Sequence, residues 1–235
     1  NFLEMVRLLG QRTAEMHLAL SELPAVEGFR PEPFSLLYQK SLYQSFRSFT
    51  RRSFAAIRGQ AGSLDPLVKE GLDRVLGLEE GFLNLAQKIL ERKKLPALKT
   101  RIHGNYKLDK LLFTGRDFII TDFEGEVEHP LSVRKLRHSP LKDVASLLGS
   151  LHFAISKGQL YRREFLPARD RTLHALVEQW HERVSSVFLE GYMPVMAGRG
   201  VVPDEAGQAG DLLQLFLLEK AIEELRLFLF SDPGS

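Results

Sequence analysis

Two polar segments near the middle of the chain have residue types that suit phosphoryl transfer. The first is 103–105, His-Gly-Asn, and the second is 122–126, Asp-Phe-Glu-Gly-Glu. A carboxylate can hold Mg²⁺ against the phosphates of a nucleotide, while a loop residue orients or deprotonates the acceptor hydroxyl. The residues between the two segments predict two short strands that fold back on each other. We therefore expect both segments to face one cleft, at the same end of a small sheet.

The acidic residues of the second segment allow two interpretations. Asp122, Glu124, Glu126 and Glu128 alternate along the chain, and such a run is commonly a set of solvated loop charges. The position directly after a predicted strand instead favours a metal site. Asp122 is then the expected ligand, Glu124 a second candidate and Glu126 a weaker one.

Two further residues are expected to support the loop. His103, before Gly104, is interpreted as a structural histidine that braces the loop backbone. Asp143 lies shortly after Pro140, at the start of a predicted helix. It either accepts amide protons from the loop or caps that helix, and the sequence leaves both roles open.

The elements that position these residues are mostly helical. Apolar residues recur every three or four positions over long stretches, which predicts helices, and only residues 98–121 alternate in the way that predicts strands. The predicted helices cover 2–21, 35–58, 65–93, 140–156, 166–193 and 210–230, and the predicted strands cover 98–103, 110–114 and 117–121. The sequence thus predicts an α+β fold that is mainly α, a single domain over 1–235 with a small central β-hairpin.

The composition limits the classes of function. The chain has 235 residues, 44% of them apolar, which is enough for a sizeable core. Its 32 basic and 30 acidic residues leave a formal charge of +2, too small for strong attraction to a nucleic-acid backbone. The lack of cysteine excludes disulfides, thiolate zinc sites and a cysteine nucleophile, and it fits a cytoplasmic location. No apolar stretch approaches the roughly 18 to 20 residues of a membrane-spanning helix.

Residues 46–54 interleave phenylalanine with arginine, a pattern that can bind single-stranded nucleic acid by stacking and charge. The alternative is an amphipathic helix, because Tyr43, Phe46, Phe49 and Ser53 fall three or four residues apart and share one face. We favour the helix. No nucleic-acid partner and no membrane partner are expected.

Residues 101–110, Arg-Ile-His-Gly-Asn-Tyr-Lys-Leu-Asp-Lys, resemble the catalytic loop of maltokinases, relatives of the aminoglycoside phosphotransferases in the protein-kinase-like superfamily. Further segments are similar to the same family in the expected order, namely 9–20, 121–126, 139–145, 188–192 and 218–221. The resemblance covers most of the chain. It implies the helical C-terminal lobe of a protein-kinase-like fold.

The resemblance also implies an activity. Maltokinases use ATP and Mg²⁺ to phosphorylate maltose at its anomeric hydroxyl, in trehalose and α-glucan metabolism, often in fusion with a trehalose synthase. It further implies a set of site residues: Asn105 at the position of the family's aspartate base, His103 and Asp143 as loop braces, Asp122, Glu124 and Lys110 at the metal, Asp122 and Lys107 at the cofactor, and Tyr192, Glu219 and Lys220 at the substrate.

Three positions depart from the family pattern. Asn105 replaces the aspartate base, Lys107 replaces a histidine and Lys110 replaces a glutamine metal ligand. An amide cannot accept the sugar proton, and loss of a general base costs about 10²- to 10⁴-fold in rate. The Lys110 ammonium either repels a second Mg²⁺ or takes its place as a substitute cation, and Asp109 beside it is a possible source of an oxygen ligand.

Two functions therefore stay open. One is a maltokinase-type enzyme, and the other is a degenerate kinase-like module with a structural or α-glucan-binding role. Nothing in the chain resembles the β-rich lobe whose lysine holds the nucleotide phosphates in this superfamily, so we expect these residues alone to bind ATP weakly.

Trp180, Phe188 and Tyr192 recur along one side of the helix predicted at 166–193. Aromatic rings often line sugar sites, but core packing is the favoured interpretation for this set. Tyr192 is the member expected to reach a substrate pocket.

Overall fold

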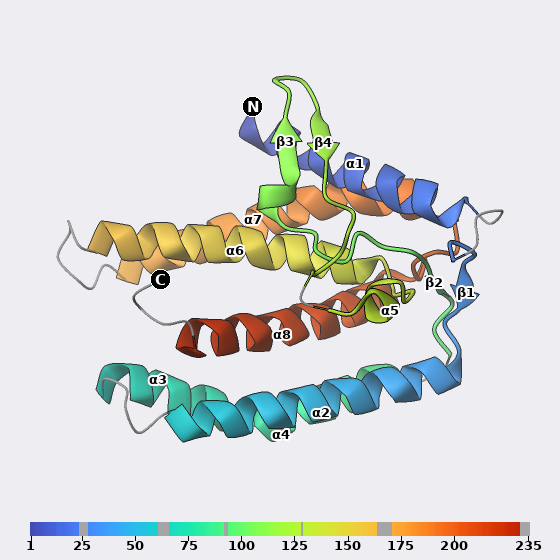
Figure 1. Ribbon diagram of the computed structural model, residues 1–235. Helices are drawn as coiled ribbons and strands as arrows, with labels where there is room; N and C mark the ends of the chain where they lie inside the picture. The colour runs from blue at the N-terminus through green and yellow to red at the C-terminus, as the bar shows by residue number, and fades with distance from the viewer. Residues whose placement is uncertain (24–27, 61–65, 92–93, 128, 164–170, 231–235) are drawn as a thin grey trace. The chain divides into compact units, whose positions relative to one another are not determined.

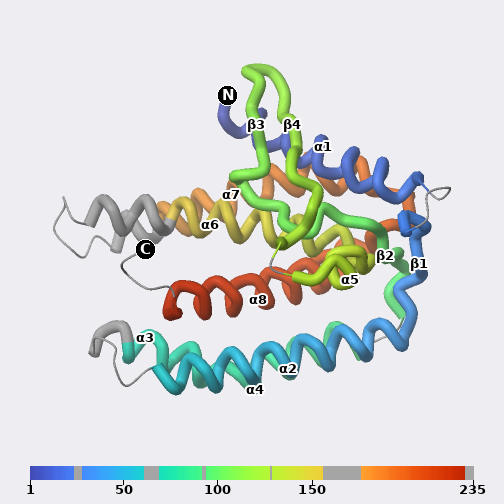
Figure 2. The backbone as a smooth tube through the Cα atoms, viewed as in Figure 1, coloured from blue at the N-terminus to red at the C-terminus, as the bar shows by residue number. Residues whose placement is uncertain are grey.

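The chain folds into helices and two very small sheets. The computed structural model describes residues 1–23, 28–60, 66–91, 94–127, 129–163 and 171–230 (Figure 1). Helices dominate and the strands form two antiparallel pairs, so the α+β, mainly α prediction is confirmed. The chain divides into two compact units, one of Asn1–Pro33 with Pro96–Glu205 and one of Phe34–Leu95 with Ala206–Ser235. Figure 2 allows the chain to be followed as it leaves the first unit after Pro33 and returns to it at Pro96.

Two glycines allow close packing of the first unit's main helix pair. Helix α1 (Phe2–Ser21) lies beside α7 (Arg171–Met196), as Figure 1 shows. A Cβ atom added to Gly10 would lie 2.2 Å from the carbonyl oxygen of Phe188, and one added to Gly191 would lie 2.1 Å from that of Arg7. Any side chain at either position would force the two helices apart.

The strands of the first unit are shorter than the sequence predicts. Strand β1 (Glu32–Pro33) pairs with β2 (Leu98–Lys99), and β3 (Leu111–Phe113) pairs with β4 (Phe118–Ile120). The central β-hairpin is thus confirmed, whereas the predicted strand 98–103 forms only β2. Beyond β2, backbone hydrogen bonds between Thr100 and His138 form an isolated bridge.

An ion pair fixes the hairpin to α1. The Arg12 guanidinium donates from Nε to Asp117 Oδ1 at 2.8 Å and from Nη2 to Oδ2 at 2.9 Å. Asp117 lies in the turn between β3 and β4, so this two-pronged contact sets the direction in which the hairpin leaves the helix pair. Both side chains are partly exposed, so solvent screens the pair and it adds little to stability.

The remaining helices of the first unit follow the hairpin. The short helix α5 (Leu131–Arg134), absent from the predicted elements, precedes α6 (Leu141–Arg163). Helix α6 extends past the predicted end at 156, and α7 continues through Pro194 to Met196. The predicted start of that helix, 166–170, lies outside the described residues.

The second unit contains α2 (Leu36–Gln60), α3 (Pro66–Leu76), α4 (Glu79–Leu90) and α8 (Ala206–Phe230). The single helix predicted at 65–93 is wrong, because the chain turns between α3 and α4. There the amide of Gly77 bonds to Asp73 O and that of Leu78 bonds to Val75 O, which tightens the last turn and ends the helix.

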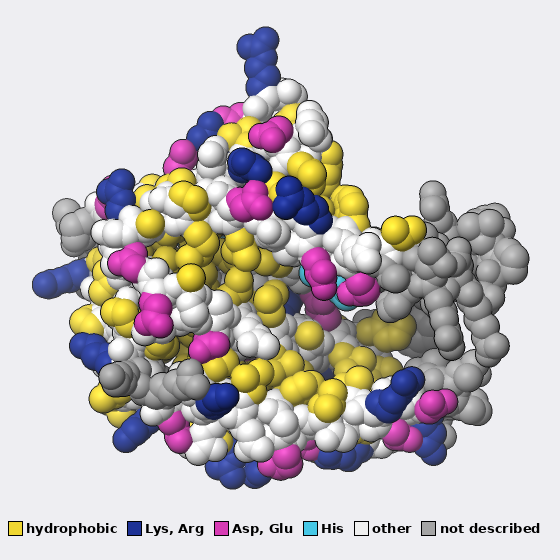
Figure 3. Space-filling model, turned by 180° about the vertical axis from the view of Figure 1, so that it is seen from behind, with side chains coloured by type: hydrophobic (Ala, Val, Ile, Leu, Met, Phe, Trp, Pro, Cys, Tyr) yellow, Lys and Arg dark blue, Asp and Glu magenta, His cyan; other side chains and the backbone are white. Residues whose placement is uncertain are grey.

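Helix α2 has the predicted amphipathic character. Phe46, Ser53 and Phe54 are buried, while Arg51 and Arg52 are exposed. The Gln39 side chain joins α2 to the end of α4, because its Nε2 donates to Leu90 O at 2.9 Å. On the described surface shown in Figure 3, basic and acidic side chains are interspersed. No helix among the described residues is long and apolar enough to cross a membrane.

Candidate phosphoryl-transfer site

Asp143 braces the loop that follows β2. The amide of His103 donates to Asp143 Oδ2 at 2.7 Å, and the amide of Gly104 donates to Oδ1 at 3.0 Å. Gly104 has φ +81°, a conformation that glycine adopts at little cost. Of the two roles that the sequence leaves open for Asp143, the structure shows hydrogen bonds to the loop amides.

The Asp143 carboxylate stays ionised although it is almost fully buried. Burial alone would raise its pKa, but the hydrogen bond from His17, the charge of His17 and the Gly104 amide together lower that pKa below its usual range. His17 Nε2 lies 3.1 Å from Asp143 Oδ2, and His17 Nδ1 lies 2.9 Å from the Tyr192 hydroxyl. Because an ionised carboxylate only accepts, His17 Nε2–H donates to Asp143, while Nδ1 forms the hydrogen bond with the Tyr192 hydroxyl.

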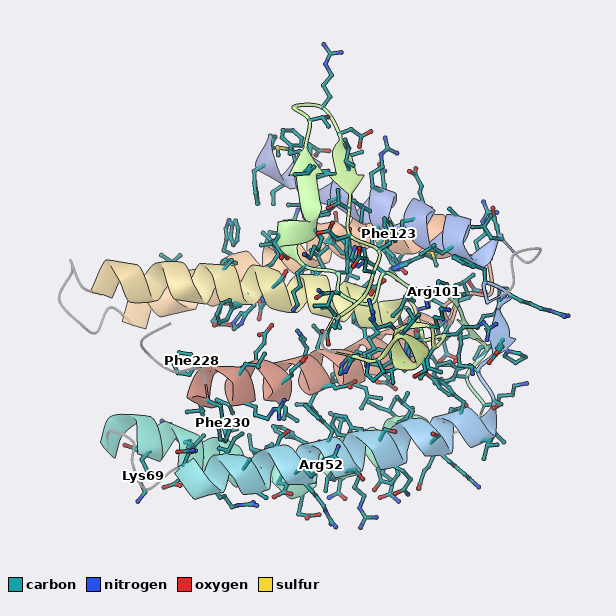
Figure 4. The ribbon with its side chains drawn as sticks, viewed as in Figure 1. Arg52, Lys69, Arg101, Phe123, Phe228 and Phe230 are labelled. Atoms are coloured by element: carbon teal, nitrogen blue, oxygen red, sulfur yellow. The ribbon has the colours of Figure 1, made fainter. Side chains whose placement is uncertain are left out.

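His103 connects the loop to the end of the hairpin. Its Nε2 lies 2.8 Å from the carbonyl oxygen of Thr121, and its Nδ1 accepts from the Asn105 amide at 3.3 Å. The imidazole therefore carries its proton on Nε2. The ring packs against Phe123, labelled in Figure 4, with 4.8 Å between ring centres. These contacts bring the segments 103–105 and 122–126 together.

Asp122 follows β4 in an uncommon backbone conformation. Its φ of +63° is the only positive φ of a non-glycine residue among those described. Asp and Asn adopt this region more readily than other residues, and such outliers gather at functional sites. The conformation turns the exposed Asp122 side chain away from the direction that a continuing strand would give it.

An ammonium group accompanies this carboxylate. Lys110 Nζ lies 3.1 Å from Asp122 Oδ2 and 3.3 Å from Asp109 Oδ2. Lys110 is also fixed through its backbone, because its carbonyl oxygen accepts from the Thr121 amide at 3.0 Å. The hydrogen bonds to Asp122 and then to Asp109 raise the pKa of Lys110. The lysine therefore remains charged at neutral pH.

As arranged, these side chains do not fit a bound Mg²⁺. The ion takes oxygen ligands in a near-octahedral shell, and the Lys110 ammonium lies beside the one well-placed carboxylate. The Glu124 side chain is exposed. Its backbone carbonyl accepts a hydrogen bond from Arg134 Nη1 at 3.0 Å. Within the described part of the chain, no group of three His, Cys, Asp or Glu residues could hold a metal ion.

Asn105 offers an acceptor at the predicted position of the base. Its Oδ1 is buried and has no hydrogen-bond partner among the described residues. A carbonyl oxygen in this state can accept a hydrogen bond from a hydroxyl but cannot take its proton. Lys107 is partly buried, and its carbonyl accepts from the Lys110 amide at 3.0 Å in the short 3₁₀ turn before β3.

The predicted substrate residues are divided between the two units. Tyr192 is fully buried, with its hydroxyl on His17, so it belongs to the support behind the loop. Phe188 is also buried in the core, whereas Trp180 is partly exposed and stacks on Phe2 at 5.4 Å. Glu219 and Lys220 belong to α8 of the second unit, where Lys220 Nζ pairs with Glu223 at 2.8 Å.

Sequence reasoning assigned no individual role to the α1 residues behind the loop. Thr13 and His17 are fully buried, and Thr13 Oγ1 lies 2.8 Å from the hydroxyl of Tyr106. The available signal was their spacing. Two polar residues four positions apart lie on the same helix face as Val6 and Leu9, and polar side chains on a buried face require partners.

No protein-family model matches the chain. Among solved structures it is similar to a glucosamine kinase in crystal form B, with a TM-score of 0.73 and 18% identity over 97% of this chain and 49% of that one. It is equally similar to a glucosamine kinase in complex with glucosamine, ADP and inorganic phosphate, with a TM-score of 0.72 and 18% identity over 97% and 48% of the two chains. The chain thus spans about half the length of these kinases.

This likeness defines the fold. The chain has a sugar-kinase-like fold, and the prediction of a mainly helical α+β fold with a small hairpin is confirmed. At 18% identity the comparison shows the fold alone.

Proposed function

We propose that this chain is the C-terminal lobe of a maltokinase-type sugar kinase with an attenuated catalytic loop. The observation that carries the proposal is the string of hydrogen bonds from Asp143 through His103 to Thr121, which holds the loop against the strand end that bears Asp122. Phosphoryl transfer relies mainly on positioning and electrostatics, so a scaffold of this kind is what the reaction requires.

In the proposed reaction the anomeric hydroxyl of maltose attacks the γ-phosphoryl group of ATP, giving maltose 1-phosphate and ADP. Asn105 Oδ1 accepts the hydrogen bond of that hydroxyl and orients it, and the proton leaves to water because an amide cannot take it. A trehalose synthase is the proposed fused or associated partner, and the cytoplasm the proposed location.

The test is phosphorylation of maltose, followed by ³¹P NMR on the complete protein with saturating ATP and MgCl₂. We expect slow formation of maltose 1-phosphate, and a rate about 10² to 10⁴ higher in Asn105→Asp, which restores a base. Arg116→Gln, an exposed change in the hairpin turn, serves as the control and should match the unchanged protein. No turnover in either the unchanged protein or Asn105→Asp would refute the proposal.

A second function, a degenerate kinase-like module that supports a trehalose synthase or binds α-glucan, is favoured by Lys110. Its ammonium lies between Asp109 and Asp122, where a kinase would need oxygen ligands for a metal. In this case the unchanged protein has no activity, and the double change Asn105→Asp with Lys110→Gln creates it. Equal activity in the two proteins would exclude this second function.

A further inference from the structure

Basic side chains gather where Thr100 and His138 form their backbone bridge. The Thr100 amide donates to His138 O at 2.9 Å, and the His138 amide donates to Thr100 O at 3.0 Å. The neighbours of this bridge form what we call the basic cluster: Lys99, Arg101, Arg134, Arg137 and Lys142. Nothing in the proposed reaction uses the cluster.

One acidic residue balances part of this charge. Glu32 on β1 pairs with Lys99 at 2.6 Å and with Arg137. Arg101 and Arg134, in contrast, have no carboxylate partner among the described residues. Arg101 Nη1 donates to the Arg134 carbonyl at 2.6 Å, and Arg134 Nη1 donates to the Glu124 carbonyl at 3.0 Å. Arg134 Nε is buried and makes no hydrogen bond in this part of the chain.

The two guanidinium groups act on each other. Burial lowers the pKa of Arg101, and the positive charge of Arg134 lowers it further. The pKa of the neighbouring His138 is also lowered, to about 4, by burial and then by cations that include Lys142 and Arg101. His138 therefore stays neutral at pH 7. Partly buried cations that repel each other without a counter-ion are unfavourable, and an anion bound by both removes that cost.

We propose that Arg101 and Arg134 form a binding site for a phosphate group. A guanidinium presents parallel N–H donors at the spacing of phosphate oxygens. Among the described residues, each of these two arginines donates one hydrogen bond, to a backbone carbonyl. Figure 4 shows Arg101 beside the α5 segment, consistent with its hydrogen bond to Arg134.

The position of the site gives it a consequence for the loop. Arg101 precedes His103 by two residues, and the Arg134 side chain packs against Gly125, where an added Cβ would lie 3.5 Å from Arg134 Cγ. A phosphate group held by both arginines would join the start of the 103–105 loop to the segment that follows Asp122. Its binding is expected to stabilise the loop without contact to Asn105 or Asp122.

The experiment is titration of the full chain with inorganic phosphate, measured by calorimetry and by thermal unfolding against sodium chloride at equal ionic strength. We expect saturable binding, with a rise in Tm that chloride does not produce. A second arm uses methyl phosphate and distinguishes a site for free phosphate from one that accepts a phosphoryl group on carbon. Binding of either ligand supports the site.

Matched variants locate the binding. Arg101→Gln and Arg134→Gln should each weaken phosphate binding at least about tenfold. Arg101→Lys should weaken binding less, because lysine keeps the positive charge but loses the paired N–H donors of the guanidinium. Arg116→Gln should leave binding unchanged. Circular dichroism of each variant verifies folding. If a glutamine variant does not fold, the weaker phosphate binding expected of Arg101→Lys still tests the proposal. Absence of saturable binding of both ligands, or equal binding by all variants, would overturn the proposal. Neither result bears on maltose phosphorylation.

Discussion

Individual side chains determine how the loop is held, and Asp143 is the most connected of them. Its carboxylate is almost fully buried, and it accepts hydrogen bonds from two loop amides and from the His17 imidazole. The same carboxyl group would be hard to bury without those donors, because desolvation of a charge is costly. The support of the loop thus depends on one negative charge.

Replacing that charge should destabilise the first unit. In Asp143→Asn the amide retains the size but cannot accept from two backbone amides and His17 as a carboxylate does, so we expect the free energy of unfolding to fall by about 2 to 4 kcal/mol. Urea unfolding measures the change. Asp109→Asn, an exposed residue, is the control and should shift the midpoint little. A loss below about 0.5 kcal/mol in Asp143→Asn would contradict this account.

His138 predicts a pH dependence of stability. Its pKa is about 4 in the folded chain, against about 6.5 when unfolded, so below pH 6.5 the unfolded chain binds more protons. Stability is therefore full above about pH 6.5 and falls by about 3 kcal/mol in total as pH drops towards 4. Urea midpoints between pH 7 and 4.5 test this, and His138→Asn should flatten the curve. An equal slope in both proteins would assign the loss to other groups.

At the scale of elements, the α1–α7 pair depends on backbone contact at two glycines. Gly191→Ala places a Cβ about 2.1 Å from the Arg7 carbonyl, too close for any rotamer to relieve. We expect a loss of at least about 1 to 3 kcal/mol in urea unfolding. Gly81→Ala in α4 has open space and should instead gain up to about 1 kcal/mol from helix propensity. A neutral Gly191→Ala would show that the helices separate easily.

The sequence predicts this level of structure unevenly. Long periodic helices such as α1 and α2 were found close to their true ends, and the hairpin followed from the Gly115 turn between two apolar runs. The break at Gly77 was missed, because a single glycine inside a periodic helix is often tolerated and only local hydrogen bonds decide the outcome. Helix α5 is four residues long and too short to show a period.

The candidate site was predictable where neighbours in sequence decide it. His103, Asn105 and Asp122 lie near each other because a short hairpin joins them. The contact of His17 with Tyr192 depends on how α1 packs against α7, and that of Thr13 with Tyr106 depends on how the loop packs against α1. No local pattern specifies which residues meet across such contacts.

At the scale of the molecule, two compact units share one chain that crosses between them. The second unit joins α2, α3 and α4 to α8, and about 110 residues of the first unit separate these segments. If the first unit unfolded alone, closing that loop would cost the second unit about 4 kcal/mol. The two units are therefore expected to unfold together, as the single domain predicted from the sequence would.

The single tryptophan makes this measurable. Trp180 lies in the first unit, so its fluorescence reports that unit, whereas far-ultraviolet circular dichroism reports the helices of both. We expect the two urea transitions to coincide within error. A fluorescence transition displaced from the dichroism transition would show that the units unfold separately.

The buried Asp143 also gives the loop a property that is rare outside regular structure. The amides of His103 and Gly104 belong to no helix or strand, yet both donate hydrogen bonds to a carboxylate that is almost inaccessible to solvent. Their hydrogens should exchange with solvent only when the surroundings of that carboxylate open, and hence as slowly as amides of the core helices. Exchange at two loop positions thus measures the integrity of the candidate site without substrate, nucleotide or metal.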